Sequence, residues 1–148
     1  MKMVNVGEKA PDAELKDVDG KSVSISGFAG KKVLLSFFPF AFSPVCTKEF
    51  GCFMDDMEKF GDKGVEVVGI SVDSHWSNKA FADSLGVDIP LLSDFDKSAS
   101  KAFGILRSEG FSERAYFLID ENGVIRYKHV MGNPAEKLDD DELLKNIR

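Results

Sequence analysis

A short apolar run that leads directly into a helix start constrains the fold of this chain most. The run Val33–Phe38 predicts a buried strand, because nearly every residue in it is apolar. Ser43 and Pro44 follow as a helix-start signal, with a hydroxyl at the N-cap and a proline at the first helical position. Apolar residues then recur at helical spacing; they are Phe50, Phe53, Met54 and Met57. The segment therefore predicts a strand, a loop and a helix from about Pro44 to Phe60.

Cys46 falls in the first turn of this predicted helix. Backbone N–H groups in a first turn have no partner within the helix, and together with the helix dipole they favour a thiolate over a neutral thiol. A free thiol has a pKa of about 8.5, and helix N-termini or nearby cations lower such values to roughly 3.5–7.5. Cys46 is therefore the candidate nucleophile; the alternative is an ordinary buried cysteine.

The rest of the chain alternates between strands and helices. Turn residues at Asp19-Gly20 and at Glu121-Asn122-Gly123 each predict a hairpin. The predicted strands are 13–18, 22–25, 33–38, 65–71, 89–92, 115–120 and 124–130, and the predicted helices are 44–60, 77–85, 97–103 and 134–147. We interpret the acidic run 139–142 in the last helix as a solvated face. The order β-β-β-α-β-α-β-α-β-β-α predicts a single α/β domain over residues 1–148.

Composition narrows the possible functions. The net charge of −6 argues against a nucleic-acid partner. Residues 1–12 lack the features of a signal peptide, and no apolar run approaches the length of a membrane span, so we expect no membrane partner. The chain has two cysteines and no targeting signal, a combination typical of a reducing compartment, and we expect a cytoplasmic protein.

The residues around Cys46 resemble the active-site motif of the peroxiredoxins, which reads P-x-x-x-T/S-x-x-C. Pro39, Ser43 and Cys46 occupy its three defined positions, at a strand-to-helix turn. Thr47 and Glu49 extend the resemblance. Two further segments, 7–12 and 69–74, are also similar to family segments, although the aromatic residue usually found just after the first of them is absent here.

This resemblance covers nearly the whole chain and implies a thioredoxin-like fold, with a central mixed β-sheet flanked by helices and an N-terminal β-hairpin extension. Within the family, the chain most resembles two subgroups. One contains the one-cysteine proteins similar to alkyl hydroperoxide reductase E, and the other contains the proteins similar to the bacterioferritin comigratory proteins. The implied activity is thiol-dependent reduction of hydrogen peroxide, alkyl hydroperoxides or peroxynitrite through Cys46, which becomes a sulfenic acid. The implied reductant is thioredoxin, a glutaredoxin-like protein or a low-molecular-weight thiol, and the implied assembly is a homodimer.

Peroxide reduction needs a thiolate, donors that align the peroxide, a positive charge and exclusion of water. By resemblance, Ser43 orients the peroxide and Pro39 shields the thiolate. From the residues alone, Ser43 is a helix N-cap whose hydroxyl can accept from the Cys46 N–H, and Pro39 only ends a strand. The two roles of Ser43 are compatible.

The cation should be an arginine, because a guanidinium stays charged and addresses two oxygens at once. The candidates are Arg107, Arg114, Arg126 and Arg148. The resemblance selects Arg114, at the start of the predicted strand 115–120; the alternative is an arginine that faces solvent. By resemblance, Glu49 orients this arginine; the alternative is a first-turn acid that complements the helix dipole.

Cys52 leaves the route of recycling open. Six residues of helix correspond to about 9 Å of rise and about 240° of rotation, whereas a disulfide needs Cα atoms within about 7 Å. Some relatives that resemble the bacterioferritin comigratory proteins carry a resolving cysteine five residues on and unwind the helix to use it. Here the spacing is one residue longer, although Gly51 favours local unwinding. Cys52 is either that resolving cysteine or a bystander, with an external thiol as the reductant.

Other residues carry weaker signals. The phenylalanines Phe37 and Phe38 are expected in the core. Trp76 is interpreted as half-buried, with lining of the active-site approach as the alternative. The two histidines are isolated, so the sequence indicates no metal site, and no cofactor is expected.

Two other classes of function remain as alternatives. One is a thioredoxin-like disulfide oxidoreductase, which the absence of C-x-x-C disfavours. The other is a non-enzymatic redox sensor or chaperone on the same fold. Consumption of peroxide in the presence of a thiol separates all three.

Overall fold

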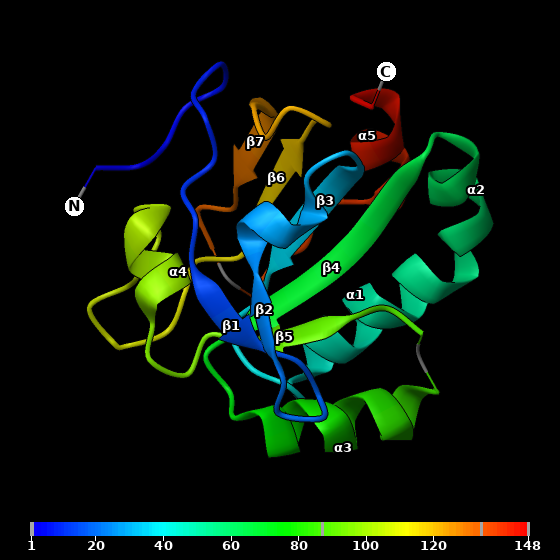
Figure 1. Cartoon of the computed structure of the whole chain (residues 1–148). Coiled ribbons are helices and arrows are strands. Elements are labelled where there is room, and N and C mark those ends of the chain that lie inside the picture. Colours follow the sequence, from blue (N-terminus) through cyan, green and yellow to red (C-terminus); the bar gives the residue numbers. More distant parts are fainter. Residues whose placement is uncertain (1, 87, 134, 148) are drawn as a thin grey trace.

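The strands of the computed structural model, which describes residues 2–86, 88–133 and 135–147, pair into one mixed sheet. They are β1 (Glu14–Lys16), β2 (Ser22–Ser24), β3 (Lys32–Phe37), β4 (Val65–Ser71), β5 (Leu91–Ser93), β6 (Ala115–Ile119) and β7 (Ile125–Val130). Their order across the sheet is β2-β1-β5-β4-β3-β6-β7 (Figure 1). The central strand β3 runs parallel to β4 and antiparallel to β6. The mixed sheet and the N-terminal hairpin of β1 and β2 confirm the predicted architecture.

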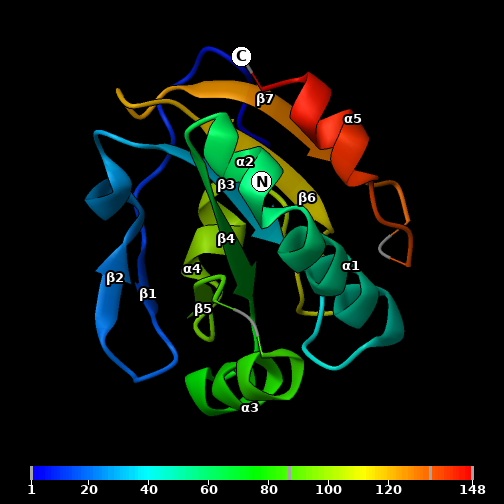
Figure 2. The ribbon, with the colours of Figure 1, turned by 90° about the vertical axis from the view of Figure 1, so that its right-hand side faces the viewer.

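Helices cover both faces of this sheet (Figures 1 and 2). They are α1 (Pro44–Asp55), α2 (Met57–Asp62), α3 (His75–Leu85), α4 (Ser98–Ala102) and α5 (Asp140–Lys145), with a short 3-10 turn, η1 (Ile25–Phe28), before β3. Among the described residues, no helix combines the length and the apolar character that a membrane crossing requires.

Side chains of β3 alternate between two apolar clusters, as expected for a strand buried on both faces. Val33, Leu35 and Phe37 join the cluster that contains Phe103, just after α4. Leu34 and Phe38 join the cluster formed with α1, α2, α3 and α5. The expectation that Phe37 and Phe38 belong to the core is confirmed, since both are fully buried.

Helix α1 lies close against β4 because β4 carries a glycine there. A Cβ atom on Gly69 would stand 2.7 Å from Cζ of Phe50 and 2.7 Å from Cδ2 of Leu91. Only the absence of a side chain lets the Phe50 ring of α1 rest directly on the strand. This contact sets the height of α1, and therefore of Cys46, above the sheet.

Two helix predictions were wrong in their extent. The helix expected from 44 to 60 is divided at Asp56, where α1 ends and α2 begins. The helix expected from 134 to 147 is helical only from Asp140 to Lys145, and its predicted first residue, Pro134, lies outside the described residues. The acidic run was also misread in part, because Asp140 is buried. Residues 136–139 are not helical, and the N–H of Leu138 donates to the hydroxyl of Tyr116 on β6.

Candidate active site

The loop between β3 and α1 is fixed from the neighbouring strand. The N–H of Ala41 donates to Oδ2 of Asp73 at 2.7 Å, and the hydroxyl of Ser71 donates to the same oxygen at 2.8 Å. Phe42 has a positive φ of 67°, which is uncommon for a residue with a side chain. Asp73 was not recognisable from the sequence as a contact of this loop, because its role depends on how β4 lies beside β3.

Cys46 lies in the first turn of α1, at the position that the sequence predicted. Pro44 is the first helical residue, so Cys46 is the third. The side chain is fully buried within the cluster that also contains Phe50 and Phe38. Its thiol is therefore screened from bulk water and lies next to first-turn N–H groups that have no partner within the helix.

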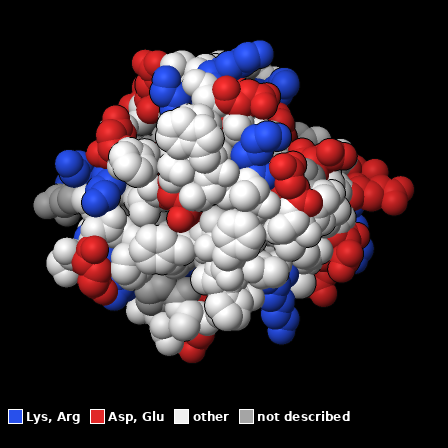
Figure 3. Space-filling view, turned by 90° about the horizontal axis from the view of Figure 1, so that it is seen from below, with Lys and Arg blue, Asp and Glu red and all other residues white. Residues whose placement is uncertain are grey.

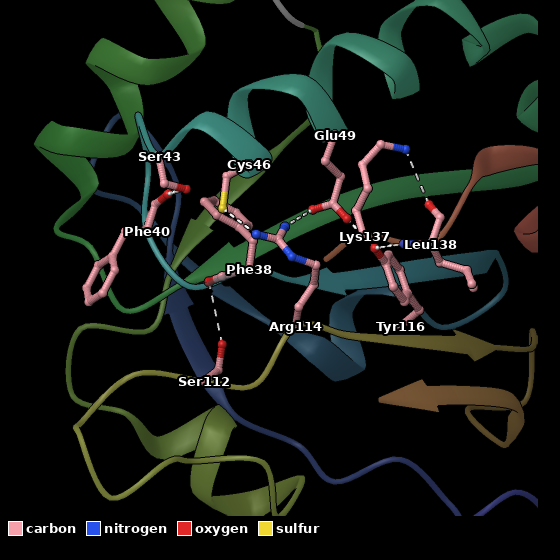
Figure 4. A network of polar contacts seen from close by, with 10 residues as sticks. All are labelled: Phe38, Phe40, Ser43, Cys46, Glu49, Ser112, Arg114, Tyr116, Lys137 and Leu138. Atoms are coloured by element: carbon pink, nitrogen blue, oxygen red, sulfur yellow. Dashed lines mark hydrogen bonds and ion pairs between the residues drawn. The ribbon is translucent and has the colours of Figure 1, made fainter. Parts of the chain in front are cut away.

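Arg114 reaches Cys46 because of the pairing of β3 with β6. Phe37 lies opposite Ala115 in this antiparallel pair, so Arg114 stands beside the end of β3, where α1 begins. Its Nη2 lies 2.9 Å from Sγ of Cys46 (Figure 4). The side chain is only 1% exposed, so the alternative of a solvent-facing arginine was wrong.

Glu49 holds the other side of the same guanidinium. Its Oε1 accepts from Nη1 of Arg114 at 2.6 Å, one turn of α1 beyond Cys46. Glu49 is fully buried, and burial raises its pKa above the ordinary value, although Arg114, Tyr116 and Lys137 act in the opposite direction. Glu49 is therefore not simply an acid that complements the dipole of α1, because its carboxylate faces Arg114 in the interior.

Arg114 remains a cation in this setting. Burial alone would lower its pKa, but the negative charges of Glu49 and Cys46 outweigh burial, and the pKa lies above the ordinary arginine value. One guanidinium thus bridges a carboxylate and a sulfur in a site closed to water. This arrangement suits a charge that develops on sulfur or on a departing oxygen.

Tyr116 is a member of this network that sequence reasoning missed. It is fully buried two residues after Arg114 on the same face of β6, and its hydroxyl donates to Oε2 of Glu49. The Tyr116 hydroxyl oxygen in turn accepts from the N–H of Leu138 at 3.1 Å. Burial, followed by the charge of Glu49, raises the pKa of Tyr116 above the ordinary value, so it remains a phenol. The period-two spacing from Arg114 was the available signal.

Ser43 lies at the start of α1 but does not cap it through its side chain. The hydroxyl donates to the carbonyl of Phe40 at 3.0 Å, and no hydrogen bond from a first-turn N–H reaches it. The expected bond from the Cys46 N–H was therefore wrong. The Ser43 hydroxyl instead points back into the loop, where its proton is directed at the Phe40 carbonyl. Pro39 is buried beside this loop.

The remaining candidates lie away from the network. Cys52 is half-buried on α1, and both cysteines are unpaired. Arg107 pairs with Glu109 and Glu113, and Arg126 pairs with Asp120. Arg148 lies outside the described residues.

The exposure of Trp76 differs from the prediction, and the described residues contain no cluster in which a histidine could bind a metal. Trp76 is 73% exposed, so the prediction of a half-buried tryptophan was wrong. Within residues 2–86, 88–133 and 135–147, no group of three or more His, Cys, Asp or Glu side chains is placed to hold a metal ion.

Known proteins with similar sequences share a family. The model of the AhpC/TSA family matches residues 6–128. The chain is 41% identical over 127 residues to wheat (Triticum aestivum) chloroplastic peroxiredoxin Q, which covers 84% of this chain and 58% of that protein. It is 38% identical over 149 residues to mouse (Mus musculus) peroxiredoxin-2, which covers 93% of this chain and 75% of that protein. The chain thus spans less than two thirds of the wheat relative.

Solved structures show the same fold. The reduced 2-Cys peroxiredoxin of Plasmodium vivax superposes with a TM-score of 0.83 at 35% identity, covering 96% of this chain and 93% of that one. The AhpC of Mycobacterium tuberculosis superposes with a TM-score of 0.87 at 22% identity, covering 99% and 92% of the two chains. The second likeness is one of fold alone.

Proposed function

The chain belongs to the AhpC/TSA family of peroxiredoxins, and on that premise we propose that it reduces hydrogen peroxide, alkyl hydroperoxides or peroxynitrite through Cys46. The observation that carries this proposal is the 2.9 Å contact between Nη2 of Arg114 and Sγ of Cys46, inside a site that excludes bulk water. A buried cation beside a first-turn cysteine supports a thiolate nucleophile.

In the proposed step, the thiolate sulfur of Cys46 attacks the terminal oxygen of the peroxide. An S–O bond forms and the O–O bond breaks. The second oxygen leaves as hydroxide, as alkoxide or, from peroxynitrite, in nitrite, and hydroxide or alkoxide then takes up a proton supplied by the buffered solvent. Cys46 remains as a sulfenic acid. Arg114 stabilises the thiolate and the departing oxygen, and the Ser43 hydroxyl orients the peroxide. Pro39 shields the sulfur, and Glu49 orients the arginine.

We propose an external thiol as the reductant of this sulfenic acid, supplied by thioredoxin, a glutaredoxin-like protein or a small thiol. The continuity of α1 from Pro44 to Asp55 supports this route, because it keeps Cys46 and Cys52 on different sides of one helix. Resolution by Cys52 requires that helix to unwind, and it is the outcome that would replace this proposal. Two unpaired cysteines also support a reducing compartment such as the cytoplasm.

A homodimer is the proposed assembly, formed through the apolar face next to the active site. Four exposed aromatic residues support this choice: Trp76 at the start of α3 and Phe95 line the same hollow, Phe42 packs against Phe81 of α3, and Phe40 belongs to the same loop as Phe42. The side of the molecule seen from below has few charges near its centre (Figure 3). Copies with a net charge of −6 repel one another least where charges are sparse, so this face suits a second copy.

The assembly can be tested by sedimentation velocity over a range of protein concentrations. We expect a dimer that Trp76→Glu shifts to monomer. The matched control is Val6→Glu, because Val6 is an exposed apolar residue beside Gly7, whose N–H donates to the Ile125 carbonyl on the edge strand β7. A wild-type protein that is monomeric at every concentration would contradict the dimer.

The proposed activity is tested by mixing the reduced protein with one equivalent of hydrogen peroxide. We expect oxidation much faster than that of a free thiol and, by mass spectrometry, one dimedone adduct on Cys46. Cys46→Ser should abolish both. Oxidation no faster than that of a free thiol would exclude the peroxidase, and the disulfide oxidoreductase and redox-sensor alternatives would then be tested by disulfide reduction and partner binding.

A further inference from the structure

A single tyrosine hydroxyl links the active-site ion pair to the segment that precedes α5. Tyr116 lies on β6, two residues after Arg114, and packs in the apolar cluster that contains Phe50 and Phe53 of α1. Its oxygen donates to Oε2 of Glu49 and accepts from the N–H of Leu138 at 3.1 Å (Figure 4). Both hydrogen bonds lie in the interior, where an unpaired polar group is costly.

Glu49 needs a donor on each carboxylate oxygen. Neither oxygen reaches solvent, since the residue is fully buried. Arg114 donates a hydrogen bond to Oε1, and Tyr116 donates one to Oε2. Burial raises the pKa of Glu49, and the hydrogen bond from Tyr116 is among the contacts that lower it again. Without this phenol, the carboxylate would be protonated at a higher pH.

We propose that Tyr116 is a positioning residue for peroxide reduction, which keeps Glu49 ionised and in place so that the Arg114 guanidinium stays aligned on the Cys46 sulfur. This inference rests on the proposed peroxidase function. Arg114 contacts the reacting sulfur, whereas Tyr116 acts on that sulfur only through Glu49 and Arg114. A protonated Glu49 would hold Nη1 of Arg114 less strongly, and the orientation of the guanidinium would be less well fixed.

Several charged groups face Glu49 and set the direction of the effect. From β6 come Arg114 and Tyr116, and from the segment before α5 comes Lys137, whose positive charge favours the carboxylate. Cys46 lies one turn away on α1, and Asp140 at the start of α5 is close enough for its charge to interact with that of Glu49. Negative charge on Cys46 or Asp140 favours protonation of Glu49. Neither residue can therefore offset the loss of the hydrogen bond from Tyr116.

The test compares Tyr116→Phe with Tyr127→Phe, since these are the two tyrosines of the chain. Tyr127 lies on β7 and is a control for loss of a partly buried phenol. We expect Tyr116→Phe to lower the second-order rate constant for oxidation by hydrogen peroxide about tenfold at neutral pH. We also expect its rate to fall at a higher pH than the wild-type rate as the solution is acidified, because Glu49 is protonated earlier. Tyr127→Phe should match the wild type in both respects.

Two further measurements separate positioning from a structural role. In the double variant Tyr116→Phe with Glu49→Gln, the additional acidic fall should disappear, because glutamine does not titrate. The thiolate fraction of Cys46, followed by ultraviolet absorbance, shows which part of each profile belongs to the thiol. Carbon NMR of the Glu49 carboxyl in reduced protein should show the pKa of Glu49 higher in Tyr116→Phe than in wild type.

A Tyr116→Phe variant with the wild-type rate and pH profile would overturn the inference. So would an acidic fall that persists unchanged in the double variant. Failure of the wild-type protein to react faster than a free thiol is a different result, because it would overturn the proposed peroxidase function instead.

Discussion

The guanidinium of Arg114 contacts the sulfur of Cys46 at 2.9 Å although 68 residues separate them in the sequence. The antiparallel pairing of β3 with β6 makes this contact possible, because it sets Ala115 opposite Phe37, so that Arg114, just before β6, lies beside the end of β3 from which the chain continues to α1 and Cys46.

Arg114→Lys should retain the positive charge but lose the fork that bridges Cys46 and Glu49. An ammonium cannot place two parallel donors on a sulfur and a carboxylate. We expect the rate of oxidation by hydrogen peroxide to fall at least tenfold and the free energy of unfolding to fall by about 3 kcal/mol, since Glu49 is left poorly paired. Stopped-flow oxidation and urea unfolding measure these effects. Arg126→Lys, at an exposed arginine, should change neither quantity.

Ser43 and Ser74 are both N-cap serines, but only Ser74 caps with its side chain, accepting from the Ser77 N–H at 3.2 Å. Ser74→Ala should therefore cost about 1 kcal/mol of stability and leave the peroxide rate near wild type. Ser43→Ala should do the reverse, with little change in stability and a rate lowered about tenfold. Ser43→Thr, which keeps the hydroxyl, should restore most of the rate. Equal rates for Ser43→Ala and wild type would remove Ser43 from the proposed mechanism.

Cys52→Ser should leave the first oxidation step unchanged, because Cys52 lies outside the Arg114 network. After one equivalent of hydrogen peroxide, both wild type and Cys52→Ser should give a dimedone adduct in the intact mass. Both should also require an added thiol to return to the reduced form. A wild-type mass that has lost two hydrogens and takes up no dimedone would instead indicate a disulfide between Cys46 and Cys52.

Asp140→Asn should stabilise the protein more at alkaline than at acidic pH. Burial and the nearby carboxylate of Asp56 raise the pKa of Asp140 to about 7, against the opposing charge of Lys137. The unfolded value is about 3.9, so the folded protein holds an extra proton between these values and loses stability as the pH rises through them. We expect the advantage of the variant in urea unfolding to be about 2 kcal/mol larger near pH 8 than near pH 5.

The control for Asp140→Asn is Asp141→Asn, because Asp141 is exposed in the same helical turn. We expect Asp141→Asn to change the free energy of unfolding by less than about 0.5 kcal/mol. An advantage of Asp140→Asn that is the same at both pH values would contradict the raised pKa.

Gly104→Ala should destabilise the fold through both backbone strain and a clash. Gly104 has a φ of +74°, and a Cβ there would stand 2.5 Å from Cα of Met3. Gly30 has a φ of +88°, but a Cβ there meets nothing within 4 Å. We expect Gly30→Ala to cost about 1 kcal/mol and Gly104→Ala at least about 2 kcal/mol more, measured by urea unfolding. Equal costs would mean that the N-terminal segment moves aside.

Local patterns predicted much of the fold and part of the site. The strand 65–71 appears with the predicted limits, and the hairpins occur at the predicted turns. The position of Cys46 was predictable because an N-cap serine and a first-turn proline act within a few residues of it. The selection of Arg114 and Glu49 came from the family motif and not from local pattern. Their mutual contact agrees with that selection.

Other features depend on which distant residues meet, and the tertiary structure decided them. Tyr116 joined the site because the register of β3 with β6 turned it toward Glu49, and a lone tyrosine in a strand pattern carries no such information. Asp140 was buried because its segment packs beside Asp56, against the polar pattern of the run. The sequence by itself determined the order of elements and the first-turn thiol, since short-range periodicity and capping specify them. Only packing decided the partners of that thiol, because burial and strand register depend on the whole chain.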